Sequence, residues 1–289
     1  MFLINVRLFY LCASLIVFYS WVLPSYAETA GQEEMPPYQT LDSLFTLYQP
    51  YLSSISAYKP MYFLVGTRPE NSRFQFSFKY RFLNPKDSVI SRHPWLNGIH
   101  FAYTQSSFWD LNSPSAPFKD TSYKPELFFL SSNLYNGSSL IERFFVQGGV
   151  EHESNGRDGV ESRSTNYIYI HPIFVFLDKT LGTGIQIAPK LFVYVGNDNQ
   201  NNPDLDAYRG FFDLMIKFGQ ENSLVCESHL RSARKGSSIQ IDLSYPLNRH
   251  VQSPINMYFQ AQYVNALAEN LINYKHRIEA FRFGFSVIR

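Results

Sequence analysis

The sequence contains few cysteines, and no long apolar run follows its first residues. Only 2 Cys occur in 289 residues. Cys12 lies in a segment that we expect to be removed, which leaves Cys226 alone and without an intrachain disulfide partner. After residue 27 no stretch reaches the roughly 18–20 apolar residues of a transmembrane helix. Disulfide-stabilised scaffolds and helical membrane bundles are therefore excluded.

An excess of charge of one sign is also lacking. The chain has 25 Lys and Arg against 24 Asp and Glu, so its formal net charge is +1. Proteins that bind nucleic acids carry a clear basic surplus on the binding domain. We therefore expect no nucleic-acid partner.

The first residues have the features of a secretory signal peptide. Arg7 provides a positive start, residues 8–23 are apolar, and Ser25-Tyr26-Ala27 fits the small-x-small cleavage pattern. A membrane anchor is the alternative, but the uncharged run is of marginal length and a cleavage site follows it. We expect a signal peptide at residues 1–27, an N-terminal periplasmic segment at 28–57 and the main domain at 58–289.

Aromatic residues are abundant, and many of them alternate with polar residues. Tyr and Phe number 20 and 26, and aromatic residues make up 17% of the chain. Between residues 74 and 82 an aromatic side chain occupies every second position, with polar side chains between. Such alternation is typical of a strand with one apolar face and one polar face. Together with a signal peptide, it favours a transmembrane β-barrel.

Further segments of this kind bring the total to about twelve, and an even number is usual for bacterial barrels. A closed barrel leaves no unpaired strand edge in the lipid. We therefore predict an all-β fold, a transmembrane antiparallel β-barrel of about 12 strands. The predicted strands lie near residues 58–65, 74–82, 98–108, 123–131, 140–154, 164–177, 185–196, 207–219, 223–233, 237–246, 255–266 and 276–288.

One predicted hairpin carries three polar residues on its apolar face. Apolar residues and Gly148 occupy alternate positions from 144 to 150, and apolar residues do so again from 168 to 176. The residues between 155 and 163 include two Gly and four charged residues, which suit a hairpin loop. By the same parity, His152, Ser154 and Asn166 emerge together on the apolar face.

These three residue types can form a hydrolytic site. Residues i and i+2 of a strand stand about 6.5–7 Å apart on one face, so His152 can act as a base for the Ser154 hydroxyl. Asn166 can orient the imidazole through its amide oxygen. The alternative is three unrelated polar residues at a loop edge. On a lipid-facing wall, however, polar groups are costly and usually functional.

Two short segments carry a resemblance to a known family. Residues 152–157, with the sequence HESNGR, and residues 162–166, with the sequence SRSTN, resemble the active-site hairpin of outer-membrane phospholipase A. The resemblance covers most of the chain from residue 75 onward. Its further motifs are Tyr103-Thr104-Gln105, Pro117-Phe118, Gly196-Asn197, Asn202-Pro203-Asp204 and Leu243-Ser244-Tyr245-Pro246.

The resemblance implies a calcium-dependent hydrolase of membrane glycerophospholipids, of the phospholipase A1/A2 and lysophospholipase type, in the outer membrane of a Gram-negative bacterium. It implies Ser154 as nucleophile, His152 as base and Asn166 as the orienting group. It also implies that the backbone N–H of Gly156 and a calcium-bound water stabilise the oxyanion.

A metal site and a partner are implied in the same way. Ca²⁺ would be bound by the Ser162 side chain, by backbone oxygens around Arg157 and Ser162, and by Ser115 from a second barrel. Gln105, on the apolar face of its strand, implies a polar contact in a homodimer; the alternative is that its amide reaches the lipid headgroups. The residues that depart from the usual family pattern are Ala116, Glu153, Gly159 and Thr165.

The alternative to an enzyme is a non-enzymatic barrel, a pore or adhesion scaffold that retains the hairpin. Such a protein would share the signal peptide, the alternation and the aromatic content. Only the set of His152, Ser154 and Asn166 separates the two hypotheses, and it favours the hydrolase.

Overall fold

The structure is a computed structural model, and it describes residues 54–83, 88–135, 141–178, 180–220, 222–248 and 256–289. The chain divides into two units, at residues 1–46 and 47–289, and the described residues all belong to the second. The predicted signal peptide at 1–27 and nearly all of the predicted segment at 28–57 lie outside the described residues.

The described residues form one antiparallel sheet with 13 labelled strands. The strands are β1 (Ile55–Ala57), β2 (Met61–Gly66), β3 (Ser72–Arg81), β4 (Ile99–Trp109), β5 (Phe118–Leu130), β6 (Arg143–Ser154), β7 (Ser164–Asp178), β8 (Thr183–Tyr194), β9 (Phe212–Gln220), β10 (Val225–Ala233), β11 (Gly236–Pro246), β12 (Tyr258–Leu267) and β13 (Arg277–Ile288). The short helices are η2 (Pro69–Asn71), α3 (Ser88–Arg92), η3 (Pro94–Gly98), η4 (Gly159–Glu161) and α4 (Leu205–Arg209). Among the described residues no helix is long and apolar enough to cross a membrane.

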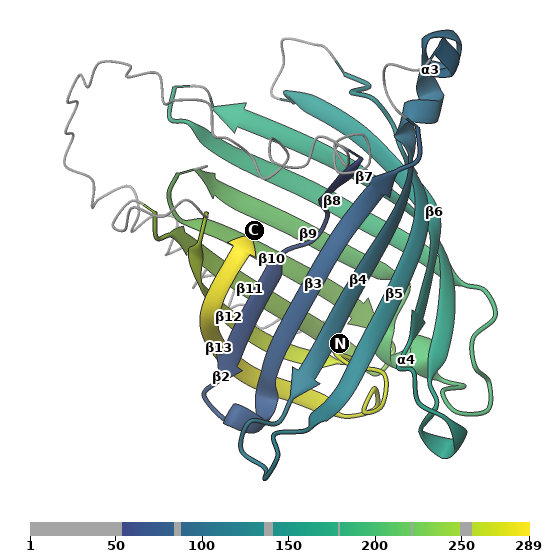
Figure 1. Cartoon of the computed structure of the whole chain (residues 1–289), viewed down its shortest axis with the longest axis vertical. Coiled ribbons are helices and arrows are strands. Elements are labelled where there is room, and N and C mark those ends of the chain that lie inside the picture. Colours follow the sequence, from purple (N-terminus) through teal and green to yellow (C-terminus); the bar gives the residue numbers. More distant parts are fainter. Residues whose placement is uncertain (1–53, 84–87, 136–140, 179, 221, 249–255) are drawn as a thin grey trace, which may run out of the picture. The chain divides into compact units, whose positions relative to one another are not determined.

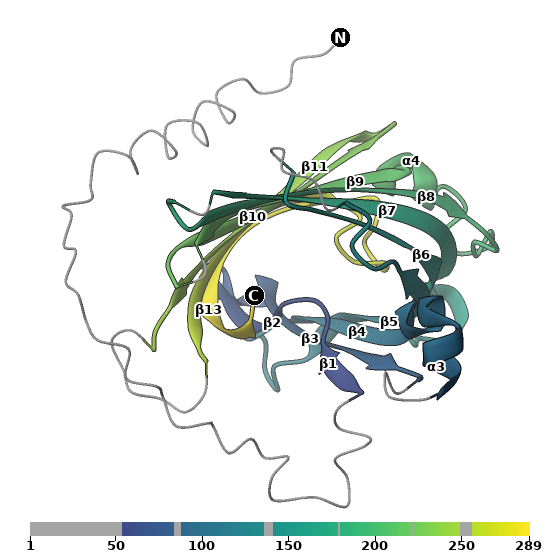
Figure 2. The same cartoon turned by 90° about the horizontal axis from the view of Figure 1, so that it is seen from above.

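The sheet closes on itself to form a barrel (Figures 1 and 2). β1 pairs with β3 near Tyr80, and β2 pairs with β3 near Phe74, so these two short strands share one position in the sheet. β13 pairs with β2, and β3 pairs with β4, which completes a ring of 12 positions. The predicted all-β barrel of about 12 strands is therefore confirmed.

Several strand boundaries differ from the sequence prediction; β5, for example, begins at Phe118 and not at residue 123. The first strand begins at Ile55, before the expected start of the main domain at residue 58. Residues 205–209, which partly overlap the predicted strand at 207–219, form helix α4 instead. The helix ends at Arg209 and is capped by Gly210, whose φ of 76° suits glycine, and β9 starts only at Phe212.

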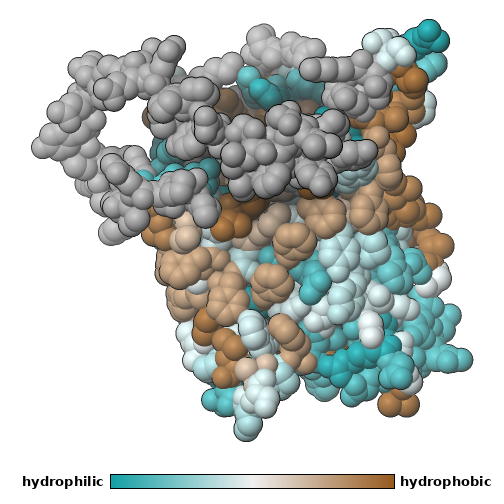
Figure 3. All heavy atoms as spheres, in the orientation of Figure 1, coloured by the Kyte–Doolittle hydropathy of each residue, from teal (hydrophilic) through white to brown (hydrophobic). Residues whose placement is uncertain are grey.

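Side chains alternate between the barrel lumen and the outer wall. On β3, Phe76 is 42% exposed whereas its neighbour Ser77 is fully buried. Figure 3 shows apolar residues across the middle of one face of the wall and mostly hydrophilic residues toward the lower end. An apolar outer wall around a polar lumen is the arrangement that a bilayer requires of a barrel.

One end of the barrel, which we call the site end, carries the loops 110–117, 155–163, 195–211 and 268–276. The last of these loops folds into the lumen. Its Glu269 forms ion pairs with Arg282 at 2.6 Å and with Arg73 at 3.3 Å, and Leu271 is fully buried. Charged and apolar side chains from a loop therefore fill the lumen at the site end.

Candidate active site

The predicted hairpin is formed by β6 and β7, which pair without a register shift from Arg143 opposite Val175 to Ser154 opposite Ser164. Within this register His152 lies directly opposite Asn166. Parity decides the direction of each side chain. Glu151 and Glu153 point into the lumen and are 6% and 1% exposed. His152, Ser154 and Asn166 therefore lie on the outer wall, as their parity predicts.

The imidazole of His152 is held by an amide. Its Nδ1 lies 2.8 Å from Oδ1 of Asn166. An amide oxygen only accepts hydrogen bonds, so Nδ1 carries the proton and Nε2 of the neutral ring is left with its lone pair. Nδ2 of Asn166 donates to the carbonyl oxygen of Gly196 at 2.9 Å. This second bond fixes the amide with its oxygen toward the ring, so the outer wall presents a basic nitrogen.

Ser154 is the last residue of β6 and shares the outer face with His152. The spacing along a strand separates their Cα atoms by about 6.5–7 Å. Within the part of the chain that the structure describes, no hydrogen bond joins the two side chains. Rotation about their side-chain bonds can close the gap, and catalytic hydrogen bonds often tighten only when substrate binds.

The loop after Ser154 is organised by the amide of Asn155, which is 4% exposed. Its Oδ1 accepts the backbone N–H of Arg163 at 3.0 Å and that of Arg157 at 3.3 Å. Its Nδ2 donates to the carbonyl oxygen of Glu161 at 2.9 Å. One buried side chain thus satisfies three backbone groups, which gives the loop a defined conformation.

Gly156 occupies a position that only glycine fits. Its φ is 67°, in the left-handed region. A Cβ atom at this position would lie 2.7 Å from Cε2 of Tyr123, which comes from the neighbouring strand β5. Tyr123 also pairs with Ser154 in the sheet. The ring of Tyr123 therefore lies beside the backbone that would donate to an oxyanion.

Two of the predicted calcium ligands, Arg157 and Ser162, lie in the loop 155–163. The Arg157 side chain pairs with Glu161 at 2.5 Å and also donates to the carbonyl oxygen of Lys119. The carbonyl oxygen of Ser162 accepts a hydrogen bond from Arg163 at 2.7 Å. Hydroxyl and peptide oxygens suit calcium in kind, but the ligands predicted in this loop are fewer than the six to eight that the ion prefers.

The third predicted ligand, Ser115, lies in the loop 110–117 at the same end of the barrel. Its φ is 64°, and Trp109 donates through its indole N–H to the carbonyl oxygen of Ala116 at 2.6 Å. Asp110 accepts hydrogen bonds from Ser113, and these lower the pKa of its carboxyl although desolvation opposes them. Among the described residues, no group of three His, Cys, Asp or Glu side chains could bind a metal.

Gln105 points outward from β4. Its Oε1 accepts the hydroxyl of Tyr103 at 3.0 Å, and its Nε2 donates to Ser107 at 3.3 Å. In the sheet Gln105 pairs with Tyr123, which in turn pairs with Ser154. Gln105 and Ser154 therefore belong to one row of residues across three adjacent strands of the outer wall.

The sequence did not identify the residues behind the hairpin. Glu153 is fully buried in the lumen and pairs with Arg209 of α4 at 2.5 Å. The alternation in β6 could have placed Glu153 in the lumen. Its partner lies 56 residues further along the chain, in a loop, and no local pattern identifies such a pair.

Together, the fold and the site define a membrane β-barrel that carries a His–Asn pair and a serine on its lipid-facing wall. Residues 34–287 match the family model described as Phospholipase A1. The chain therefore belongs to the phospholipase A1 family, and it is a β-barrel of the Gram-negative outer membrane.

Curated relatives carry the same family name. Phospholipase A1 of Escherichia coli (strain K12) is 29% identical over 178 residues, which are 60% of this chain and 56% of that protein. The putative phospholipase A1 of Neisseria meningitidis serogroup B is 27% identical over 197 residues, 64% of this chain and 48% of that protein. The matched region thus spans about half the length of these relatives.

Solved structures share the fold. Outer membrane phospholipase A from Escherichia coli has a TM-score of 0.65 at 21% identity, over 81% of this chain and 94% of that chain. A Salmonella typhi outer membrane phospholipase, described as a dimer with bound calcium, has a TM-score of 0.64 at 21% identity, over 81% of this chain and 92% of that one.

Proposed function

We propose that this protein hydrolyses acyl ester bonds of membrane glycerophospholipids, with phospholipase A1/A2 and lysophospholipase activity. The observation that carries the proposal is the 2.8 Å contact between His152 and Asn166 beside Ser154 on the outer wall. An acyl ester can reach this site without leaving the bilayer. The names of the relatives support the same class of substrate.

In this mechanism Nε2 of His152 takes the proton of the Ser154 hydroxyl as its Oγ attacks the ester carbonyl. The protonated imidazole then gives that proton to the leaving alcohol, and an acyl–Ser154 ester remains. His152 next deprotonates a water that attacks this ester, and the imidazolium returns that proton to Oγ of Ser154 as the fatty acid leaves. Asn166 keeps the ring in one tautomer throughout and exchanges no proton.

The backbone N–H of Gly156 would donate to the oxyanion that forms on the carbonyl oxygen. Removal of one such donor typically costs about 2.7–4 kcal/mol in the barrier. Calcium, when bound, would supply positive charge that favours the oxyanion.

The residues proposed to hold calcium are Ser162, the backbone of Arg157, and Ser115 of a second copy of the chain. The ligands proposed from this loop are too few for the ion, so a ligand from a partner fits the requirement. Gln105 would contact the partner barrel on the same wall. Calcium binding and homodimerisation would then strengthen each other by the same factor.

A pore or adhesion scaffold is the rival hypothesis. A pore needs an open lumen, whereas at the site end Glu269 pairs with Arg282 and Arg73 inside the barrel. This arrangement favours the enzyme over a pore.

Fatty-acid release from a defined phospholipid by the refolded barrel tests the proposal. We expect release with calcium and its loss when a chelator is added. A folded barrel that releases no fatty acid at any calcium concentration would contradict it.

A further inference from the structure

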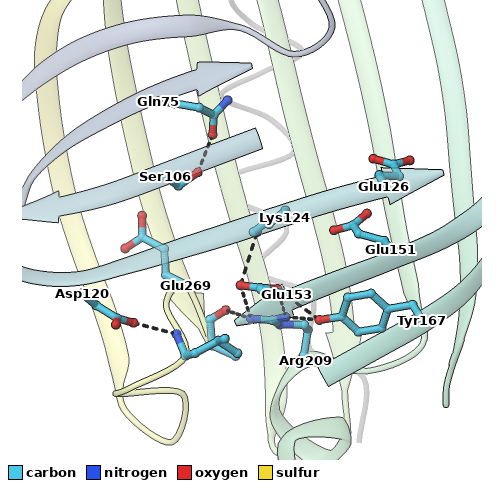
Figure 4. A network of polar contacts seen from close by, with 12 residues as sticks. Gln75, Ser106, Asp120, Lys124, Glu126, Glu151, Glu153, Tyr167, Arg209 and Glu269 are labelled. Carbon is cyan, nitrogen blue, oxygen red and sulfur yellow. Dashed lines mark hydrogen bonds and ion pairs between the residues drawn. The ribbon is translucent and has the colours of Figure 1, made fainter. Parts of the chain in front are cut away.

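Glu153 lies in β6 between the two residues that the proposed function places in the triad. His152 and Ser154 point to the lipid, so the residue between them points into the lumen. The carboxylate of Glu153 is 1% exposed and pairs with Arg209 at 2.5 Å and with Lys124 at 3.4 Å. Figure 4 shows it between these two cations. The backbone that carries the base and the nucleophile is thus held from behind.

Arg209 comes from a different part of the chain than the strand it contacts. It is the last residue of α4, in the loop 195–211 between β8 and β9. Its guanidinium also bonds the hydroxyl of Tyr167 on β7 and the carbonyl oxygen of Ala268. Arg209 therefore connects both strands of the hairpin to the site-end loops.

The same loop also contacts the hairpin at Asn166 and Ser164. Gly196 accepts from the Asn166 amide, as described above. Asn202 is fully buried and bonds both backbone groups of Ser164, donating to its oxygen at 3.1 Å and accepting from its nitrogen at 3.3 Å. The loop 195–211 thus contacts Asn166, the proposed base-orienting residue, at the end of the barrel. From the lumen it also contacts β6, the strand that carries His152 and Ser154, through the pair of Arg209 and Glu153.

The Arg209 guanidinium keeps its charge in this buried position. Burial alone would lower the pKa of the Arg209 guanidinium, but Glu153 together with the nearby Tyr167 and Tyr194 raises it overall. Two ions taken out of water stabilise a fold poorly compared with apolar side chains of similar size, and in some proteins such pairs instead specify one arrangement. A planar guanidinium is well suited to specifying one arrangement, because its donors have a fixed geometry.

We propose that Arg209 is a positioning residue that acts through Glu153. It sets the backbone orientation between His152 and Ser154, and so sets the approach of Nε2 to the serine hydroxyl. The inference rests on the proposed function. Because the lipid contacts the opposite face of the strand, loss of this control lowers the rate of the chemical step and leaves lipid binding unchanged.

The test compares two buried arginines that pair with glutamates in the same lumen. Arg209→Lys keeps the positive charge and loses the planar guanidinium. Arg282→Lys is the matched control, because Arg282 is 1% exposed and pairs with Glu269 at 2.6 Å on another wall of the barrel. For each refolded barrel, kcat, KM and the rate of Ser154 labelling by a sulfonyl fluoride are measured with calcium present.

For Arg209→Lys we expect kcat and the labelling rate to fall together by about 10- to 100-fold, since small misplacements of reacting groups have effects of this size. KM should stay within about twofold of wild type, because the substitution does not change the contacts that bind the lipid in the ground state. Arg282→Lys should lose far less of both rates. If Arg209→Lys does not fold, Glu153→Gln, of the same size, is measured instead with the same expectation.

Two outcomes would overturn this inference and leave the proposed function standing. In the first, the wild type is active and folded Arg209→Lys has the same kcat and labelling rate. In the second, Arg282→Lys loses as much of both rates as Arg209→Lys. A folded wild type that neither labels at Ser154 nor hydrolyses lipid would overturn the proposed function, and this inference with it.

Discussion

Nδ1 of His152 and Oδ1 of Asn166 meet at 2.8 Å across directly opposed positions of β6 and β7. The pair stands on the outer wall, where a water-soluble hydrolase would have no reason to place it. Because the amide is itself held by Gly196 at 2.9 Å, the ring is presented in one tautomer to a neighbouring serine. The predictions below follow from this arrangement.

Asn166→Ala should lower kcat by about 100-fold, the size of effect that a misplaced reacting group produces. The imidazole keeps its basic nitrogen in this variant and loses the hydrogen bond that fixes its orientation and its tautomer. The residual rate should therefore remain well above that of Ser154→Ala. Initial rates of fatty-acid release from the two folded variants decide the matter, and equal losses would count against a purely orienting role.

Gly156→Ala should abolish most of the activity, while Gly159→Ala should retain it. Both glycines have a positive φ, of 67° and 54°, so both substitutions carry a similar backbone strain of about 1–2 kcal/mol. Only at Gly156 would the new Cβ meet Tyr123, at 2.7 Å, whereas nothing lies within 4 Å at Gly159.

The two variants are compared by kcat at saturating calcium and by the thermal stability of the barrel. Similar loss of activity in both would show that strain in the loop, and not the position of the Gly156 N–H, limits catalysis.

Mixing two impaired variants should restore activity if Ser115 acts across a dimer interface. A barrel with Ser115→Ala retains its own triad, and a barrel with Ser154→Ala retains its Ser115. In a mixed dimer one site is complete, so an equal mixture should reach about a quarter of the wild-type activity for a symmetric dimer with random pairing. Ser113→Ala, from the same loop, serves as the control for loop damage. No gain on mixing would place Ser115 outside the site of the partner.

Glu269→Gln should lower the free energy of unfolding by about 3–5 kcal/mol at pH 7, since it leaves Arg282 and Arg73 buried without their carboxylate. Burial raises the pKa of Glu269, but the nearby Arg282 and Arg73 together lower it further, so the folded pKa is below the usual value. Its contribution is therefore fully present above about pH 4.3, the unfolded pKa, and is lost as the pH falls through the folded pKa.

Urea unfolding of both barrels between pH 7 and pH 3 measures this difference. The difference in the free energy of unfolding between wild type and Glu269→Gln should become smaller only at the acidic end of this range. Glu279→Gln, at an exposed position on β13, should change stability little at any pH. A gap that widens with acid would contradict the assigned ion pairs.

The barrel was predictable because period-two alternation is a local signal. The alternating aromatics near Phe76 and the parity of His152 and Ser154 depend only on neighbours along one strand. Helix α4 was missed because its five residues are too few to show a helical periodicity.

The lumen network was missed for a different reason. Glu153 and Arg209 are brought together by the closure of the barrel and the course of a long loop. Sequence alternation indicates the face on which a side chain lies, but it does not indicate which distant charge is its partner.

The central claim is that Ser154 is the nucleophile on the outer wall. The most direct measurement treats the refolded barrel with a sulfonyl fluoride in the presence of calcium and identifies the modified residue by mass spectrometry. We expect one covalent label, on Ser154, that grows in proportion to the loss of fatty-acid release. Ser164→Ala, at the directly opposed position of β7, should label normally. Appreciable hydrolysis by a folded Ser154→Ala barrel would contradict the claim.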